Sequence, residues 1–188
     1  CLLGDRRGRC VSEALVRVEN LGKTFDATSP LPFGRRRGGV RAVDGVSFSV
    51  NRGETVAVVG ESGCGKSTLA RAILGLVKPS AGAIRWREWS MDTTDRARMR
   101  EMRRGLQVVF QDPFGSLDPR MTVGDSVREA LDALESRCDS AEARRRVAAA
   151  LVEVGLDPGF AGRYPHELSG GQCQRIAIAR ATIVRPRL

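Results

Sequence analysis

Aromatic residues are scarce in this chain of 188 residues: they make up 5% of it, beside a formal net charge of +9. Proteins that bind single-stranded nucleic acid commonly combine basic side chains with aromatic ones, on which the bases stack. No arginine run is interleaved with aromatics in that way, and the run Arg35–Arg37 lies in a stretch rich in proline and glycine. We therefore interpret the charge as solvated, arginine-rich surface and expect no nucleic-acid partner. Contact with nucleic acid or an anionic membrane is the less favoured alternative.

The sequence also lacks an apolar run near the ~20 residues that span a membrane. Its first residues have no signal-peptide pattern and no initiator methionine, and residues 1–13 remain unassigned. The cysteines form no CxxC pair and have no histidine partners at metal-binding spacing. We therefore expect reduced thiols in a cytosolic protein. The five cysteines are Cys1, Cys10, Cys64, Cys138 and Cys173.

The strongest motif that is present is Gly60–Thr68, Gly-Glu-Ser-Gly-Cys-Gly-Lys-Ser-Thr. Its spacing fits the P-loop, and it stands between an apolar β-branched run, Thr55–Val59, and a helix-compatible segment, Leu69–Leu74. Glycines let backbone N–H groups approach phosphate oxygens, and the helix N-terminus adds positive charge. The motif predicts a nucleoside-triphosphate site; the alternative is a glycine turn that binds nothing.

Each residue of this motif has a predicted role. Lys66 reaches the β- and γ-phosphates, Ser67 offers its hydroxyl to Mg²⁺, and Thr68 lies near the α-phosphate. The remaining residues that line the phosphate loop are Gly60, Ser62, Gly63, Cys64 and Gly65. The expected ligands are therefore ATP and Mg²⁺.

The rest of the chain alternates between strand and helix patterns. A turn at Asn51–Glu54 precedes the P-loop strand, and residues 26–40 form a loop or hairpin excursion. A capping box, Asp139 with Glu142, is expected to open a helix that ends at Gly155. Further helices are expected at 92–104, 123–134 and from Ser169 onward, and strands at 14–21, 42–50, 55–59, 83–86 and 106–110.

A second motif, Leu168–Gln172, reads Leu-Ser-Gly-Gly-Gln and places small residues at a helix start, another anion-binding end. Together with the P-loop, and with Gln111 at a strand end between the two, it makes residues 14–188 resemble the ATP-binding subunits of ABC transporters. The resemblance implies an α/β fold: a P-loop (RecA-like) core with an N-terminal antiparallel β part and a helical insertion, incomplete at the C-terminus. It divides the domain into residues 14–110, the β part and P-loop core, and residues 111–188, the Q-loop, helical subdomain and signature helix.

The resemblance also implies roles and partners. The signature residues Ser169, Gly170, Gly171 and Gln172 contact the ATP of a second ATP-binding subunit, so that ATP joins a head-to-tail dimer. Gln111 is the Q-loop glutamine, which touches Mg²⁺ and the attacking water. Phe25 matches the aromatic that stacks on adenine, although it is also compatible with a plain strand-end residue. Implied partners are transmembrane permease subunits and, indirectly, a solute-binding protein, at the cytoplasmic face of the membrane.

The stretch from Gln111 to Val123 looks like the corresponding region of oligopeptide and dipeptide importers, as does Tyr164–Glu167 before the signature. Nickel importers share these features, so the cargo stays open. Cys173 departs from the family, which usually has arginine there; we expect the phosphate-facing residues to be unaffected and a polar contact to be weakened.

The family's Walker B strand, which ends in Asp-Glu, and its switch histidine both belong after Leu188 and do not occur in this sequence. His166, the only histidine, precedes the signature and is interpreted as a turn residue. We therefore expect a peptide-importer ATPase subunit truncated before its catalytic carboxylate, with no hydrolysis by these residues alone. The alternatives are a soluble ABC ATPase of DNA repair or translation, and a partial reading frame without catalytic function.

Overall fold

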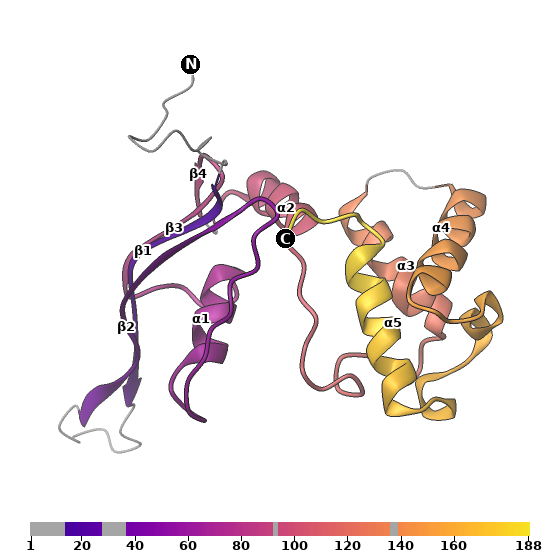
Figure 1. The fold of residues 1–188 in the computed structure, drawn as a ribbon, viewed down its shortest axis with the longest axis horizontal. Coiled ribbons are helices and arrows are strands. Elements are labelled where there is room, and N and C mark those ends of the chain that lie inside the picture. The colour runs from indigo at the N-terminus through magenta and orange to yellow at the C-terminus, as the bar shows by residue number, and fades with distance from the viewer. Residues whose placement is uncertain (1–13, 28–36, 92–93, 136–138) are drawn as a thin grey trace. The chain divides into compact units, whose positions relative to one another are not determined.

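The computed structural model describes residues 14–27, 37–91, 94–135 and 139–188. They form two compact units, one up to Arg96 and the other from Ala97 onward, and each is described by itself. Figure 1 shows the strands and α1 of the first unit and the helices of the second.

The first unit is built on a four-stranded antiparallel sheet in the order β2-β1-β3-β4. Alternating side chains make its core, because successive residues of a strand point to opposite faces. Val16 and Val18 of β1 are 2% and 1% exposed, and Val18 pairs with Phe48 on one side and Ile84 on the other. The elements are β1 (Ala14–Ala27), β2 (Arg37–Asn51), α1 (Lys66–Ile73), β3 (Ala81–Trp86) and β4 (Trp89–Ser90).

The second unit is helical, with one buried cluster to which α3, α4 and α5 all contribute. Val123, Val127 and Leu131 of α3 are each 0% exposed, which confirms the helical face predicted for residues 123–134. Two short 3-10 helices, Pro158–Gly162 and Pro165–Glu167, lead from α4 to α5. The α-helices are α2 (Arg96–Gly105), α3 (Val123–Leu134), α4 (Ser140–Glu153) and α5 (Gly170–Thr182).

Most predicted elements are confirmed, with shifted ends. β1 and β2 extend into the expected 26–40 excursion, whose residues 28–36 lie outside the described residues. The turn at Asn51–Glu54 forms, with the Glu54 carboxylate accepting from the backbone and side-chain nitrogens of Asn51. Gly155 ends the α4 region at a φ of 72°, a left-handed conformation that favours glycine.

Two predicted strands are wrong. Thr55–Val59 and Leu106–Phe110 are both outside any strand, and Val58, Val59 and Phe110 are 49%, 90% and 43% exposed. An apolar run becomes a strand only when its backbone groups pair with a neighbour. Within the described residues, neither run joins a strand ladder.

The capping box predicted at Asp139 is also wrong. Asp139 is the N-cap of α4, but its side chain makes no capping hydrogen bond. The Glu142 carboxylate instead pairs with Arg145 on the same exposed helix face. Both halves of the box are therefore absent: the Asp139 side chain caps no amide, and the Glu142 side chain is paired with Arg145.

Candidate nucleotide-binding site

The P-loop turn packs against β2 through a glycine. Gly65, the N-cap of α1, has a φ of 97°. A Cβ atom at this position would lie 2.0 Å from the backbone oxygen of Ala42 in β2. Both the left-handed backbone and the close approach therefore require glycine, and they fix the direction in which α1 leaves the loop.

The ammonium group of Lys66 lies within the loop. Its Nζ donates to the carbonyl oxygens of Gly60 and Glu61, at 2.7 Å and 2.6 Å, and lies 3.6 Å from the Sγ of Cys64. The two carbonyls are neutral, and no carboxylate of the described residues forms an ion pair with this ammonium, so hydrogen bonds orient its positive charge without neutralising it. An ammonium group held in this way can exchange its carbonyl acceptors for the anionic oxygens of a ligand that enters the loop.

The N-terminus of α1 has no side-chain cap. Ser67 is exposed and Thr68 is half-buried in this first turn. The first N–H groups of a helix have no partner within the helix and carry partial positive charge, which suits an anion. Uncapped amides, the Lys66 ammonium and the hydroxyls of Ser67 and Thr68 thus form a donor set that fits a nucleoside triphosphate. Ser62, Gly63 and Cys64, at the tip of the turn, are exposed.

Phe25 lies near the end of β1 and is 43% exposed. It pairs across the sheet with Val40 of β2, and the ammonium of Lys23 lies 5.0 Å from the centre of its ring. This cation–π contact orients the ring while leaving much of it accessible. Its predicted role, stacking on adenine, remains a prediction.

Gln111 belongs to the second unit and begins a tight turn. The Asp112 carboxylate accepts from the backbone N–H groups of Phe114 and Gly115, both at 3.1 Å. A Cβ at Gly115 would lie 2.5 Å from that carboxylate, so a larger residue there would require the Asp112 side chain to shift. Gln111 itself is exposed at the start of this turn.

The signature residues form the N-terminus of α5. Ser169 is the N-cap: its Oγ accepts from the N–H of Gln172 at 3.3 Å, while the Gln172 Oε1 accepts from the N–H of Ser169 at 2.8 Å. This reciprocal capping box fixes both side chains on their own helix. Ser169 and Gly171 are exposed, and Gly170 is half-buried.

Cys173, one turn further on, faces the interior. It is 0% exposed, its Sγ lies 3.7 Å from the carbonyl oxygen of Pro165, and burial raises the pKa of its thiol. The cysteine thus fills the helical core.

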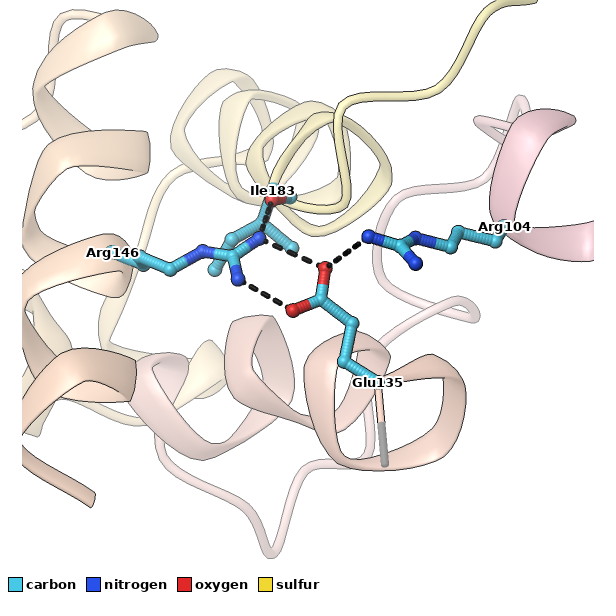
Figure 2. Close-up of polar contacts among 4 residues, drawn as sticks. All are labelled: Arg104, Glu135, Arg146 and Ile183. Atoms are coloured by element: carbon cyan, nitrogen blue, oxygen red, sulfur yellow. Dashed lines mark hydrogen bonds and ion pairs between the residues drawn. The ribbon is translucent and has the colours of Figure 1, made fainter. Parts of the chain in front are cut away.

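A polar network that the sequence did not predict joins four segments of the second unit (Figure 2). Arg146 of α4 donates to Glu135, at the end of α3, and to the backbone oxygen of Ile183, at the end of α5. Arg104 of α2 lies 3.5 Å from the same carboxylate. The only local signal was the charge of these residues, since the partners are up to 37 residues apart.

The described residues contain neither a candidate metal-binding group nor a candidate membrane span. No three His, Cys, Asp or Glu side chains gather there as a candidate metal-binding group. None of the helices in the described ranges has the length and apolar character that crossing a membrane requires.

The glycine turn, its lysine and the helix that follows are those of a P-loop protein. The chain belongs to the ABC transporter family, because the family model described as "ABC transporter" matches residues 43–188. This confirms the family predicted from the two motifs.

Curated relatives share much of the sequence. The oligopeptide transport ATP-binding protein OppF of Haemophilus influenzae is 45% identical over 177 residues, which are 94% of this chain and 53% of the relative. The oligopeptide transport ATP-binding protein AppF of Bacillus subtilis is 45% identical over the same shares of both chains. This chain therefore spans about half the length of the curated relatives it matches.

Solved structures confirm the fold class. The ATP-binding cassette MJ0796, in a dimeric post-hydrolysis state bound to ADP and Pi, matches with a TM-score of 0.75 and 30% identity, over 91% of this chain and 70% of that one. The cbiO1 protein of Clostridium perfringens, part of the transporter complex cbiONQ, matches with a TM-score of 0.73 and 30% identity, over 93% and 63%. The chain has the ABC cassette fold, with an N-terminal antiparallel sheet and a helical part.

Proposed function

We propose that this chain is the nucleotide-binding part of an ATPase subunit that energises the import of oligopeptides or dipeptides through an ABC transporter. The relatives named as oligopeptide transport ATP-binding proteins support this cargo. Nickel remains the alternative cargo. A soluble ATPase of DNA repair or translation is less well supported, because the named relatives are transport proteins.

The observation that carries the proposal is the position of Lys66. Its ammonium is already held at the centre of the loop by the carbonyls of Gly60 and Glu61. When a triphosphate enters, the ammonium exchanges these neutral acceptors for anionic phosphate oxygens, which form stronger, charge-assisted hydrogen bonds. Gly60–Gly65 and the first amides of α1 then surround the phosphates, and Phe25 stacks on the base.

Ser67 and Gln111 are the residues proposed to hold Mg²⁺, through a hydroxyl and an amide oxygen, ligand types that this hard cation accepts. The ion supplies neutralisation of the negative charge that develops on the phosphates during transfer. Each residue is described within its own unit: Ser67 would offer its hydroxyl from the first turn of α1, and Gln111 would offer its amide from the start of the Asp112 turn.

The N-terminus of α5 is proposed to bind the triphosphate held by a second ATP-binding subunit. Ser169, Gly170, Gly171 and Gln172 offer a helix start with small residues, and two of these residues are exposed. Such an end attracts anions through its free amides. The proposed assembly also contains permease subunits, with a solute-binding protein acting on the outer side and this chain at the cytoplasmic face.

The proposal is tested by titrating a fluorescent ATP analogue against the wild-type chain and Lys66→Ala. We expect the dissociation constant to rise about ten-fold or more, equivalent to ~1.4 kcal/mol. Lys78→Ala is the matched control, since Lys78 is exposed in the same unit, beyond α1. It should change the constant by less than about two-fold, under ~0.5 kcal/mol. Equal affinities for wild type and Lys66→Ala would contradict the proposed site.

The transport assignment has its own test. The full-length protein, expressed with a tag in its native cell, should co-purify with membrane permease subunits after mild detergent extraction. Co-purification with nucleic acid or ribosomes instead would favour the soluble alternative.

A further inference from the structure

The turn after Gln111 is fastened to α5 at three points. The first is a hydrogen bond in which the Arg180 Nη1 donates to the backbone oxygen of Ser116 at 2.7 Å. The second is the place of the Phe114 ring beside Gly170, where a Cβ added to the glycine would meet the ring at an ordinary van der Waals distance of 3.5 Å. The third is Leu117, which is 4% exposed and belongs to the core cluster that includes Ile176 of α5.

The turn itself is rigid because its polar groups are satisfied internally. Asp112 caps two amides, as described above, and the Ser116 hydroxyl donates to the carbonyl of Pro113 at 2.8 Å. The N–H of Leu117 donates to the carbonyl of Phe114 at 3.3 Å. A segment closed in this way moves as a body, so a contact at Ser116 also restrains the chain at Asp112.

Arg180 is placed to transmit that restraint. It lies in the last turn of α5, half-buried, and joins residues 64 positions apart in the sequence. The donor of this hydrogen bond is the charged guanidinium and the acceptor is a neutral carbonyl. Such a bond is stronger than one between two neutral groups. Removing it leaves Phe114 and Leu117 to hold the turn by apolar contact, which is less directional.

We infer that Arg180 is a positioning residue that fixes the Gln111–Leu117 turn to the signature helix, so that Gln111 and the N-terminus of α5 move together. This inference rests on the proposed function, in which Gln111 and α5 serve two different nucleotide sites. Through Arg180, the position of Gln111 at one site and that of the signature residues at the other are set together. The residue therefore affects turnover and leaves the affinity of the P-loop for ATP unchanged.

The test uses Arg180→Met, which keeps an unbranched apolar side chain in place of the arginine stem and removes the guanidinium donors. Arg175→Met is the matched control, because Arg175 also lies on α5 and donates to a backbone oxygen, that of Gly155, at 3.4 Å. Arg180→Lys is the rescue, since it restores a charged donor. All are made in the full-length protein, and thermal unfolding identifies any variant that does not fold.

Hydrogen exchange of the peptide containing residues 112–117 is the first readout. Arg180→Met should speed exchange of its protected amides about ten-fold, while Arg175→Met and Arg180→Lys stay near wild type. ATP hydrolysis is the second readout. Arg180→Met should lower kcat about ten-fold with KM changed less than about two-fold, and Arg180→Lys should regain at least about half of kcat.

Unchanged exchange in Arg180→Met, or a loss of kcat equal to that of Arg175→Met, would overturn the inference. A rise in KM without a loss of kcat would overturn it as well. Absence of hydrolysis by the wild-type protein would contradict the proposed function instead, and the exchange experiment would still decide whether Arg180 holds the turn.

Discussion

Arg146 donates to the carboxylate of Glu135 from both terminal nitrogens of its guanidinium, at 2.6 Å and 3.1 Å (Figure 2). The same guanidinium donates to the backbone oxygen of Ile183 at 2.8 Å, where α5 ends. The Glu135 and Arg146 side chains are 16% and 26% exposed. Because the pair is largely shielded and bidentate, it fixes the ends of α3 and α5 to the middle of α4 more firmly than an exposed ion pair does.

The first prediction is that Glu135→Gln lowers the free energy of unfolding by about 1.5–3 kcal/mol, the usual range for a hydrogen bond to a charged group. Glu142→Gln is the control, since Glu142 pairs with Arg145 on an exposed helix face. It should cost no more than about 0.5 kcal/mol. Urea unfolding followed by circular dichroism measures both, and equal effects would contradict the role given to the Glu135 pair.

The second prediction concerns pH. The pKa of Glu135 lies below its ordinary value, mainly because its carboxylate accepts hydrogen bonds from Arg146. A lowered pKa in the folded state means that the stabilisation is fully present above the unfolded pKa, ~4.3 for glutamate, and is lost as pH falls through the folded pKa. The stability difference between wild type and Glu135→Gln should therefore be constant at neutral pH and shrink in acid. A difference that grows below about pH 4 would contradict it.

The third prediction concerns a buried hydroxyl in α3. Ser126 is 2% exposed, and its Oγ has no hydrogen-bond partner within the described residues. Burying an unpaired hydroxyl costs about 1–3 kcal/mol, and alanine has the better helix propensity. Ser126→Ala should therefore stabilise the protein, by roughly 1 kcal/mol.

Thr122→Ala provides the contrast on the same helix. The Thr122 Oγ1 accepts from the N–H of Asp125 at 3.2 Å and so caps α3. Its removal should destabilise the protein by about 1 kcal/mol. Thermal unfolding of both variants checks the pair; a destabilised Ser126→Ala would mean that its hydroxyl has a partner, such as a bound water.

Residue patterns within a short segment predicted the elements that pair with a neighbouring segment of the chain. Alternation in residues 14–21 and 42–50 was enough for β1 and β2, because these strands pair with each other across one connection. The run Thr55–Val59 has the same β-branched composition and is not a strand. Composition describes what a segment can become, whereas pairing depends on which backbone lies beside it, and that is a property of the whole fold.

The two capping boxes show that residue spacing alone is not a sufficient predictor even over a few residues. Asp139 with Glu142 and Ser169 with Gln172 both have the required spacing, yet only the second pair forms the box. A nearby arginine at position 145 takes the Glu142 carboxylate, whereas Gln172 is uncharged and is not drawn into an ion pair. The spacing of Ser169 and Gln172 is the local signal for this second box.

Contacts between residues far apart in the chain could not be predicted from the sequence. The Arg180–Ser116 and Arg146–Ile183 hydrogen bonds join positions 64 and 37 residues apart. In a chain with 31 basic residues, charge alone does not mark which arginine is placed to bind a carbonyl. The motif residues of the P-loop and signature could be predicted because their chemistry depends on local backbone; the residues that hold these motifs in place could not.

The fourth prediction is that ATP protects Cys64 from alkylation. Cys64 is exposed, and its Sγ lies 3.6 Å from the Lys66 ammonium that we propose binds phosphate. A maleimide adduct there would occupy the phosphate loop, so modified protein should not bind the ATP analogue. Mass spectrometry of digested protein follows each cysteine separately. Cys173, fully buried, should react only after unfolding; labelling of Cys64 at equal rates with and without saturating ATP would contradict the site.

The last prediction separates two roles of Ser169, which caps α5 in this structure and is proposed to contact the nucleotide of a second subunit. Glycine is nearly as good an N-cap as serine, whereas alanine costs about 1 kcal/mol of helix stability. Ser169→Ala should therefore lower the unfolding temperature of the protein, and Ser169→Gly should leave it almost unchanged. Both variants lack the hydroxyl, so both should lose ATP-driven dimerisation if that hydroxyl binds the facing triphosphate. The measurement is size-exclusion chromatography of the full-length protein with a non-hydrolysable ATP analogue. If Ser169→Gly dimerises like wild type while Ser169→Ala does not, the hydroxyl acts only as a cap, and the anion at this end is bound by the backbone amides of Gly170 and Gly171.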